Sequence, residues 1–334
     1  MTRLYISIVC LTLLGCQSGS RDSYLPGYAG QVGEVIVVMN TSLWDGQTGS
    51  EIRSVLEESQ YGLPQEEPYF KVIQVTESNF NRVLNTHRNV VWIQVSDTVT
   101  KDQFVFNKNT FSKGQMLLRI RAKNSLIANE LISKNKAGII SLLQRAELNR
   151  IISRNKKFGP KSAEKKINEK FGFKITLQKG FEIVDEKPNS MWVKLERERP
   201  LGGFRHQISQ NILIAEFPYN SRTDFLDSII LARKDSLTKL CLPGPNEGSY
   251  VTTDYEFVPP LITEIGVDEQ YAKMLRGLWR MENNFMGGPY VSLITTHPTK
   301  DKLIYIEGFV FAPQFNKLEY LRELEAIIKS LKVK

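Results

Sequence analysis

The sequence has little of the chemistry on which most enzymes and metalloproteins depend. It contains only three Cys and three His in 334 residues. His87, His206 and His297 lie far apart and outside short ligand spacings such as H-E-x-x-H, so they form no recognisable metal motif. The sequence also lacks a G-x-S-x-G nucleophile elbow and a P-loop lysine. From these absences we predict no catalytic residue, no cofactor and no metal site, which favours a non-catalytic protein.

The composition excludes several classes of chain. With 41% hydrophobic and 24% charged residues, the chain has too much apolar content for disorder, and 22 Gly with 14 Pro are too few for a collagen-like fibre. Three Cys do not make a disulfide scaffold. Because a single core stops growing well below this length, we expect two folded domains.

The N-terminus carries the strongest motif. Arg3 precedes an apolar run over residues 4–14, which is too short to span a bilayer but suits the core of a secretory signal. The run ends in Gly15-Cys16, which resembles the lipobox of bacterial lipoproteins. The alternative is an ordinary N-terminal core segment with a chance Cys. We predict a signal peptide over residues 1–15, cleavage between Gly15 and Cys16, and lipidation of Cys16.

The lipobox resemblance implies an address in the cell envelope. Residues 16–30 are polar, with Pro and Gly, and we read them as a tether. No downstream run is long enough for a transmembrane helix, so the membrane partner would be reached through the lipid anchor. Gln17 after the Cys is similar to the pattern of outer-membrane lipoproteins, and we expect the periplasmic face. Cys241 would be the only remaining Cys, and we expect it to be a small buried hydrophobe.

Residues 31–125 predict an α/β domain. Apolar runs indicate strands at 35–39, 70–75 and 90–95, and helical spacing around 52–56 and over 76–85 gives a β-α-β-α-β order. Two further strands are expected at 104–111 and 116–120.

Residues 126–162 predict a basic helical bridge, with the helical pattern running from about 125 to 157. From Lys134 to Lys174 there are twelve Lys or Arg against three Glu. One reading is a face that binds anionic lipid head groups or lipopolysaccharide. The other is a solvated helix face. Nucleic acid is a poor fit, because aromatic residues are not interleaved for base stacking.

Residues 163–334 predict an α+β domain with an antiparallel meander flanked by helices. The period of two indicates strands at 173–177, 181–184, 191–195 and 211–217, and a helix with a capping box at Ser221 and Asp224 follows. Residues 275–283 fit either a helix or a strand, of which we prefer the strand. Strands at 290–296 and 303–311 and a last helix capped by Asn316 complete the domain.

The least ordinary segment lies over residues 276–289. Arg276 and Arg280 could hold an anion while Trp279 offers a stacking face, and Glu282 and Asn283 add polar groups. We predict a candidate ligand groove from these five residues. The alternative is a solvated strand face on which Arg280 pairs with Glu282 and from which Trp279 turns into the core.

Taken together, these segments resemble a family of uncharacterised lipoproteins from Bacteroidota, known only as a domain of unknown function. The resemblance runs end to end and rests on the lipobox and five further motifs: L-P-G-Y at 25–28, L-P-G-P at 242–245, R-G-L-W at 276–279, M-G-G-P at 286–289 and E-G-F-V at 307–310. It implies an envelope lipoprotein and brings no catalytic residues. The second half also looks like the PsbP-type fold, a likeness of architecture only.

The function predicted from sequence is therefore an outer-membrane-anchored lipoprotein that binds or scaffolds another envelope component without catalysis. Its partner would be an envelope protein, an anionic lipid or a glycan. Two alternatives stay open: an envelope hydrolase or transferase with a site dispersed over loops, for which His206 could join Arg276, Arg280 and Glu282, and a lipid or glycan carrier with a large cavity.

Overall fold

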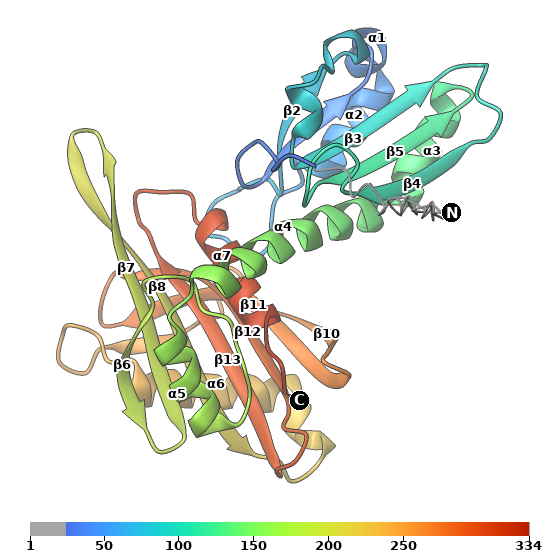
Figure 1. Cartoon of the computed structure of the whole chain (residues 1–334). Coiled ribbons are helices and arrows are strands. Elements are labelled where there is room, and N and C mark those ends of the chain that lie inside the picture. Colours follow the sequence, from blue (N-terminus) through green and yellow to red (C-terminus); the bar gives the residue numbers. More distant parts are fainter. Residues whose placement is uncertain (1–24, 334) are drawn as a thin grey trace, which may run out of the picture.

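The computed structural model describes residues 25–333, so Gly15 and Cys16 lie outside the described part of the chain. Two sheets, each with its own helices, form two parts joined by one long helix (Figure 1). The smaller part has a mixed sheet and the larger an antiparallel one. The prediction of an α+β fold with two domains is confirmed.

The N-terminal part is built on a five-stranded sheet of order β2-β1-β3-β5-β4. Its strands are β1 (Glu34–Val38), β2 (Lys71–Val75), β3 (Asn89–Val95), β4 (Gln103–Lys108) and β5 (Met116–Ala122). All pair in parallel except the edge strand β4. The apolar run that begins at Val35 forms β1, which is buried on both faces, as expected for a central strand of a parallel sheet.

Helices cover one face of this sheet. They are α1 (Thr41–Asp45), α2 (Gln47–Leu56), α3 (Ser125–Lys134) and the first half of α4 (Lys136–Phe158). On the other face, the predicted helix over 76–85 is wrong, because the chain makes two separate 3-10 turns, Glu77–Asn79 and Leu84–Thr86. The side chain of Asn81 accepts hydrogen bonds from the backbone of Val83 and Leu84, and this local turn competes with a continuous helix.

The bridge is not one helix, since α3 ends and α4 begins at Asn135. The two halves of α4 are buried in different places. Ile139 and Leu143 join the core of the N-terminal part, whereas Leu148 and Ile151 pack on Ala326 of the last helix. One continuous helix is therefore shared by both parts.

The C-terminal part is built on an eight-stranded antiparallel sheet of order β10-β11-β12-β13-β8-β7-β6, with β9 paired to β11. Its elements are β6 (Glu182–Lys187), β7 (Ser190–Leu201), β8 (Phe204–Pro218), α6 (Asp227–Cys241), β9 (Tyr250–Asp254), β10 (Leu261–Val267), β11 (Gln270–Glu282), β12 (Gly287–Thr296), β13 (Lys302–Phe311) and α7 (Leu318–Lys329). The predicted three-strand meander is present as β11, β12 and β13, and β10, which was not predicted, extends it to four strands. Helices α6 and α7 belong to the cores on opposite faces of the sheet. The capping box at Ser221 and Asp224 is present, but on a short 3-10 turn that precedes α6.

Two elements differ from the sequence prediction. Helix α5 (Lys161–Phe171) occupies the start of a region for which strands were expected. The segment 173–177 is not a strand and makes only one isolated bridge, between Lys174 and Lys332. The alternation of apolar and polar residues in this segment nevertheless predicts the buried positions correctly, because Phe173, Ile175 and Leu177 all lie in the core.

The α6 side of the C-terminal sheet encloses an ion pair. Lys234 of α6 and Glu307 of β13 are both 0% exposed, and Nζ lies 3.5 Å from Oε1. The same ammonium lies 4.3 Å from the ring centroid of Tyr290, and Tyr305 donates a hydrogen bond to the other oxygen of Glu307. Cys241 is buried on this side too, as expected.

A loop of the N-terminal part fixes α7 of the C-terminal part. Both oxygens of the Glu67 carboxylate accept backbone hydrogen bonds, at 2.7 Å from the N–H of Lys317 and 2.8 Å from that of Leu318. The prediction that Asn316 caps this helix is wrong: the first residue before the helix is Lys317, and no side chain at that position bonds to the helix. A carboxylate 250 residues away in the chain takes the role of the cap.

Candidate functional site

The predicted groove residues lie on β11, which is a strand over Gln270–Glu282. Because successive side chains of a strand point to opposite faces, Trp279 and Arg280 separate. Trp279 is 2% exposed, packs against Phe309, and donates a hydrogen bond to the carbonyl of Val310 at 3.1 Å. Arg280 is exposed on the other face and pairs with Glu282 at 3.0 Å.

Arg276 and Asn283 make contacts away from Trp279 and Arg280. Arg276 points to α7, where Nη2 lies 2.5 Å from Oε2 of Glu325. Asn283 lies in the turn after β11 with φ of 57°, and its carbonyl accepts a hydrogen bond from Asn246. A shallow hollow of about 310 Å³ brings Trp279 and Arg280 together, but Arg276, Glu282 and Asn283 do not line it. His206, which a dispersed catalytic site would need, lies with its ring against Phe315.

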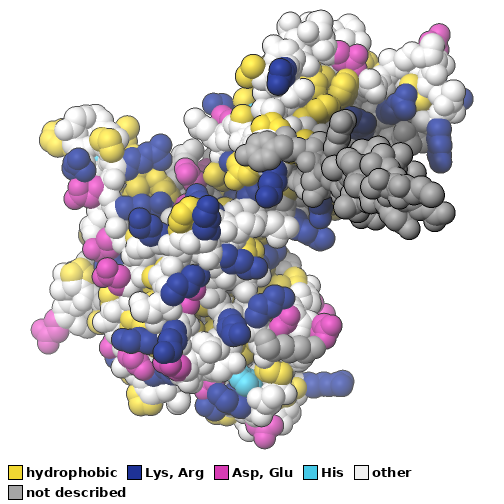
Figure 2. All heavy atoms as spheres, viewed as in Figure 1, with side chains coloured by type: hydrophobic (Ala, Val, Ile, Leu, Met, Phe, Trp, Pro, Cys, Tyr) yellow, Lys and Arg dark blue, Asp and Glu magenta, His cyan; other side chains and the backbone are white. Residues whose placement is uncertain are grey.

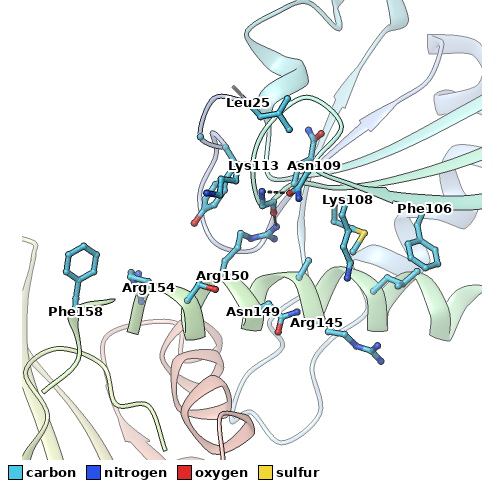
Figure 3. A pocket seen from close by; sticks show the side chains of 18 residues that line it. Leu25, Phe106, Lys108, Asn109, Lys113, Arg145, Asn149, Arg150, Arg154 and Phe158 are labelled. Carbon is cyan, nitrogen blue, oxygen red and sulfur yellow. Dashed lines mark hydrogen bonds between the residues drawn. The ribbon is translucent and has the colours of Figure 1, made fainter. Parts of the chain in front are cut away.

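A larger cavity, of about 790 Å³, lies where α4 leaves the N-terminal sheet (Figure 3). One wall is the exposed face of α4, and the other is formed by β4, the loop over 109–115 and residues 25–28. The cavity exists because α4 packs on the sheet only through its first half and then continues towards α7, leaving the end of the edge strand β4 uncovered. We call it the α4 cavity.

The lining of the α4 cavity combines apolar surface with positive charge. Its apolar and aromatic side chains are Leu25, Tyr28, Phe106, Met116, Leu142 and Phe158. Its cations are Lys108, Lys113, Arg145, Arg150 and Arg154. No Asp or Glu occurs among the described residues that line it. Such a lining suits a ligand with both an anionic group and an apolar portion.

Arg150 is a fixed part of the wall. Its guanidinium donates to the carbonyl of Gly114 at 2.7 Å and to the side chain of Asn89 at 2.6 Å, and it lies 3.0 Å from the buried carboxylate of Glu147. Burial lowers the pKa of Arg150, whereas Glu147 raises it. Glu147 is 0% exposed and also pairs with Arg88 at 2.7 Å. Glu147 is therefore shared by two guanidinium groups and balances only one of their two charges, so Arg150 holds the loop against α4 and still adds positive charge to the wall.

The other cations face the cavity more freely. Arg154 is half exposed and makes one longer contact with Glu323 of α7, at 3.4 Å. Lys108, Lys113 and Arg145 have no carboxylate partner within residues 25–333. Figure 2 shows further Lys and Arg side chains over α4 and α5 on the same face of the molecule. These unpaired cations are the charges that an anionic ligand would meet first.

The sequence reading identified the basic bridge but not the cavity. Leu142, Arg145, Asn149 and Ser153 are spaced by three or four residues, so they share one face of α4, and this stripe was readable from the sequence. Phe106 could not be assigned in the same way, because its place depends on how α4 leaves the sheet.

The described residues show neither a metal-binding cluster nor a membrane-spanning helix. Residues 25–333 contain no group of three or more His, Cys, Asp or Glu side chains positioned to hold a metal ion. Within the same residues, no helix combines the length and the apolar character that crossing a bilayer requires.

Comparison with known proteins shows the family but not its activity. The chain belongs to the family described as a domain of unknown function (DUF4837), whose model matches residues 160–330. A second domain of unknown function (DUF8532) matches residues 29–156. No protein of curated function matches significantly.

Solved structures resemble part of the chain. LpqN, involved in cell envelope biogenesis of Mycobacterium tuberculosis, is 8% identical with a TM-score of 0.27, over 47% of this chain and 79% of its own. The Ran-binding protein Mog1p of Saccharomyces cerevisiae is 10% identical with a TM-score of 0.30, over 49% of this chain and 92% of its own.

Proposed function

We propose that this protein is a non-catalytic envelope lipoprotein that binds an anionic amphipathic molecule in the α4 cavity. The carrying observation is the lining of that cavity, in which cations and aromatic side chains meet and no carboxylate balances Lys108, Lys113 and Arg145. A lipid with a phosphorylated head group has the matching chemistry: the head group would contact the cations and the acyl portion the side chains of Phe106 and Leu142.

The shape of the site supports the same proposal. The cavity of about 790 Å³ falls within the range of small-molecule pockets and would hold part of a lipid. Its anionic partner could approach over the basic face of α4 and α5, whose field would raise the association rate. A helix that only connected the two parts would need neither a cavity of this volume nor a basic face.

The test uses a soluble short-chain lipid, so that bilayer binding by an anchor does not contribute. Isothermal titration of the full chain with dihexanoyl phosphatidic acid should give saturable binding, and dihexanoyl phosphatidylcholine, which has no net charge, should bind much more weakly. Because each cation near an anionic group contributes about 1 kcal/mol, reversing one charge with Arg145→Glu should cost about 2 kcal/mol, or about thirtyfold in affinity.

Lys166→Glu is the matched control. Lys166 lies in the same basic stretch, on α5, and is exposed, but it does not line the cavity. If the site is the α4 cavity, this substitution changes affinity little. Equal losses in the two variants would show that binding is to the basic face as a whole, and equal binding of the two lipids would contradict the proposal.

The proposal includes anchoring to the outer membrane through Cys16, with the folded parts on the periplasmic face. It is supported by the charge, apolar run and small residue that precede Cys16 in the sequence. Mass spectrometry of the N-terminal peptide from cells should find a diacylated Cys16, and Cys16→Ala should abolish membrane fractionation. An unmodified N-terminal peptide would remove the anchor from the proposal.

A further inference from the structure

The N-terminal sheet has a second hollow, at the edge opposite the α4 cavity. The α4 cavity includes Gln115 and Met116, where β5 begins, whereas the second hollow lies at the carboxyl ends of β1, β2 and β3. Its volume is about 440 Å³. We call it the carboxyl-edge hollow.

The topology of the sheet produces this hollow. Strands β1 and β3 are neighbours in the order β2-β1-β3-β5-β4. After β1 the chain continues to β2, at one edge of the sheet, whereas after β3 it continues to β4, at the opposite edge. The connection after β1 lies on the face covered by α2, and the connection after β2 lies on the face that holds Phe80 and Leu84. Adjacent strands whose connections diverge leave a crevice at their carboxyl ends, and open α/β sheets bind ligands at such a crevice.

The lining is polar and nearly uncharged. Short polar side chains come from the ends of all three strands: Asn40, Thr41, Thr76, Ser78, Gln94 and Ser96. Glu77 is the only charged residue among the described residues that line the hollow, and no Lys or Arg is present there. Leu43 and Ile93 add a small apolar surface. This is the reverse of the α4 cavity, so the two hollows do not suit the same ligand.

Several of these groups are held in place with one polar atom left open. Oε1 of Glu77 accepts hydrogen bonds from Trp92 at 2.8 Å and from Gln94 at 3.2 Å, which fixes the carboxylate and leaves Oε2 without a partner in the described chain. Asn40 accepts through Oδ1 from the backbone of Leu43 at 2.9 Å, so its amide N–H₂ stays available. Hydroxyls and amides that both donate and accept are suited to a ligand rich in hydroxyl groups.

We propose that the carboxyl-edge hollow is a second binding site, for a neutral polyhydroxylated ligand of the sugar class. An anion would be repelled by Glu77 and would meet no cation. A neutral sugar can donate to the open carboxylate oxygen and exchange hydrogen bonds with Thr41, Ser78 and the amide of Asn40. The site is independent of the α4 cavity, because the two hollows share no lining residue.

The probes are glucose, N-acetylglucosamine and its β-1,4-linked dimer. Binding is measured by NMR from the backbone-amide chemical shifts of the isotope-labelled full chain. At least one probe should shift the amides of Leu43, Ser78 and Ser96 in a saturable way. Ser78→Trp places a bulky side chain in the hollow from an exposed position and should abolish the shifts. Thr41→Val removes one hydroxyl and should weaken binding about tenfold.

Two controls keep the result specific. Ser54→Trp adds the same bulk at an exposed position of α2, outside the hollow, and should leave the shifts unchanged. Arg145→Glu should also leave them unchanged, even if it weakens lipid binding, so failure of one site can be told from failure of the other. Absence of saturable shifts with all three sugars, or equal shifts in Ser78→Trp and the parent chain, would overturn the proposal. Saturable shifts with choline, a small cation that Glu77 could attract, and with none of the three sugars would also overturn the proposal.

Discussion

Replacing Glu67 by Ala should destabilise the attachment of α7 without disturbing the N-terminal sheet. The carboxylate is 3% exposed and accepts the N–H groups of Lys317 and Leu318 at the start of the helix. These are donors that a helix cannot satisfy internally, and the positive end of the helix dipole favours a negative charge at this place.

The expected magnitude follows from these two bonds. A single cap residue contributes about 0.5–2 kcal/mol, and a hydrogen bond to a charged group about 1.5–3 kcal/mol. Glu67 makes two such bonds from a buried position, so we expect a loss of about 2–3 kcal/mol in the free energy of unfolding of the C-terminal part. Glu67→Gln keeps one acceptor oxygen and should lose about half as much.

Urea denaturation measures the free energy, and hydrogen exchange locates the effect. In Glu67→Ala the amides of Lys317 and Leu318 should exchange faster, whereas Leu321, which bonds within the helix to the carbonyl of Lys317, should stay protected. The neighbouring Glu66 is exposed, so Glu66→Ala changes the same charge and should shift stability by less than about 0.5 kcal/mol. Equal stability of the two alanine variants, with unchanged exchange at Lys317, would refute the reasoning.

Two further predictions concern buried charges. Burial would raise the pKa of Glu325, but Arg276 and Lys329 outweigh it and lower the pKa to about 2. The ionised carboxylate therefore stabilises the fold fully above about pH 4.5 and loses this contribution as the pH falls towards 2; acid titration of Glu325→Gln should show a correspondingly smaller loss over that window. In the α6 core, Lys234→Met should cost about 3–5 kcal/mol in urea unfolding, because Glu307 is left buried and unpaired, and the double variant with Glu307→Leu should recover most of that loss. If the double variant were no more stable than the single one, the lysine would not be acting through the ion pair.

Local patterns in the sequence identified most of the elements. The buried strand that begins at Val35, the strand over 270–282 and the meander that ends the chain all follow from apolar runs or alternation. Helix α5 was missed although Ala163, Ile167 and Phe171 lie at helical spacing and are all buried. The helical spacing was present in the sequence. The alternation of apolar and polar residues that follows Phe171 obscured the end of the helix.

Contacts between distant residues explain why two side-chain partners could not be predicted from the sequence. Arg276 looked available for a ligand, because its partner Glu325 lies on a helix 49 residues further along the chain. Asn316 looked like a cap, because nothing local indicates that a loop of the other part supplies Glu67. The packing of α7 on the C-terminal sheet brings Glu325 to Arg276, whereas the docking of the two parts brings Glu67 to the start of α7. Sequence spacing carries no information on that docking.

Ion pairs within the protein determine which charges of the α4 cavity are most available to a ligand. Arg150 shares the carboxylate of Glu147 with Arg88, and Arg154 shares that of Glu323 with Arg197. Lys108, Lys113 and Arg145 have no carboxylate partner among the described residues, so they contribute the charge that a ligand would neutralise most readily, and they do so beside aromatic surface. A phosphate monoester, with a charge of about −1.5 to −2 near pH 7, matches these three cations better than a phosphodiester with a single charge. On the proposed function, the head group rather than the acyl chain would decide which envelope lipids bind, because the apolar wall discriminates weakly between chains of similar size.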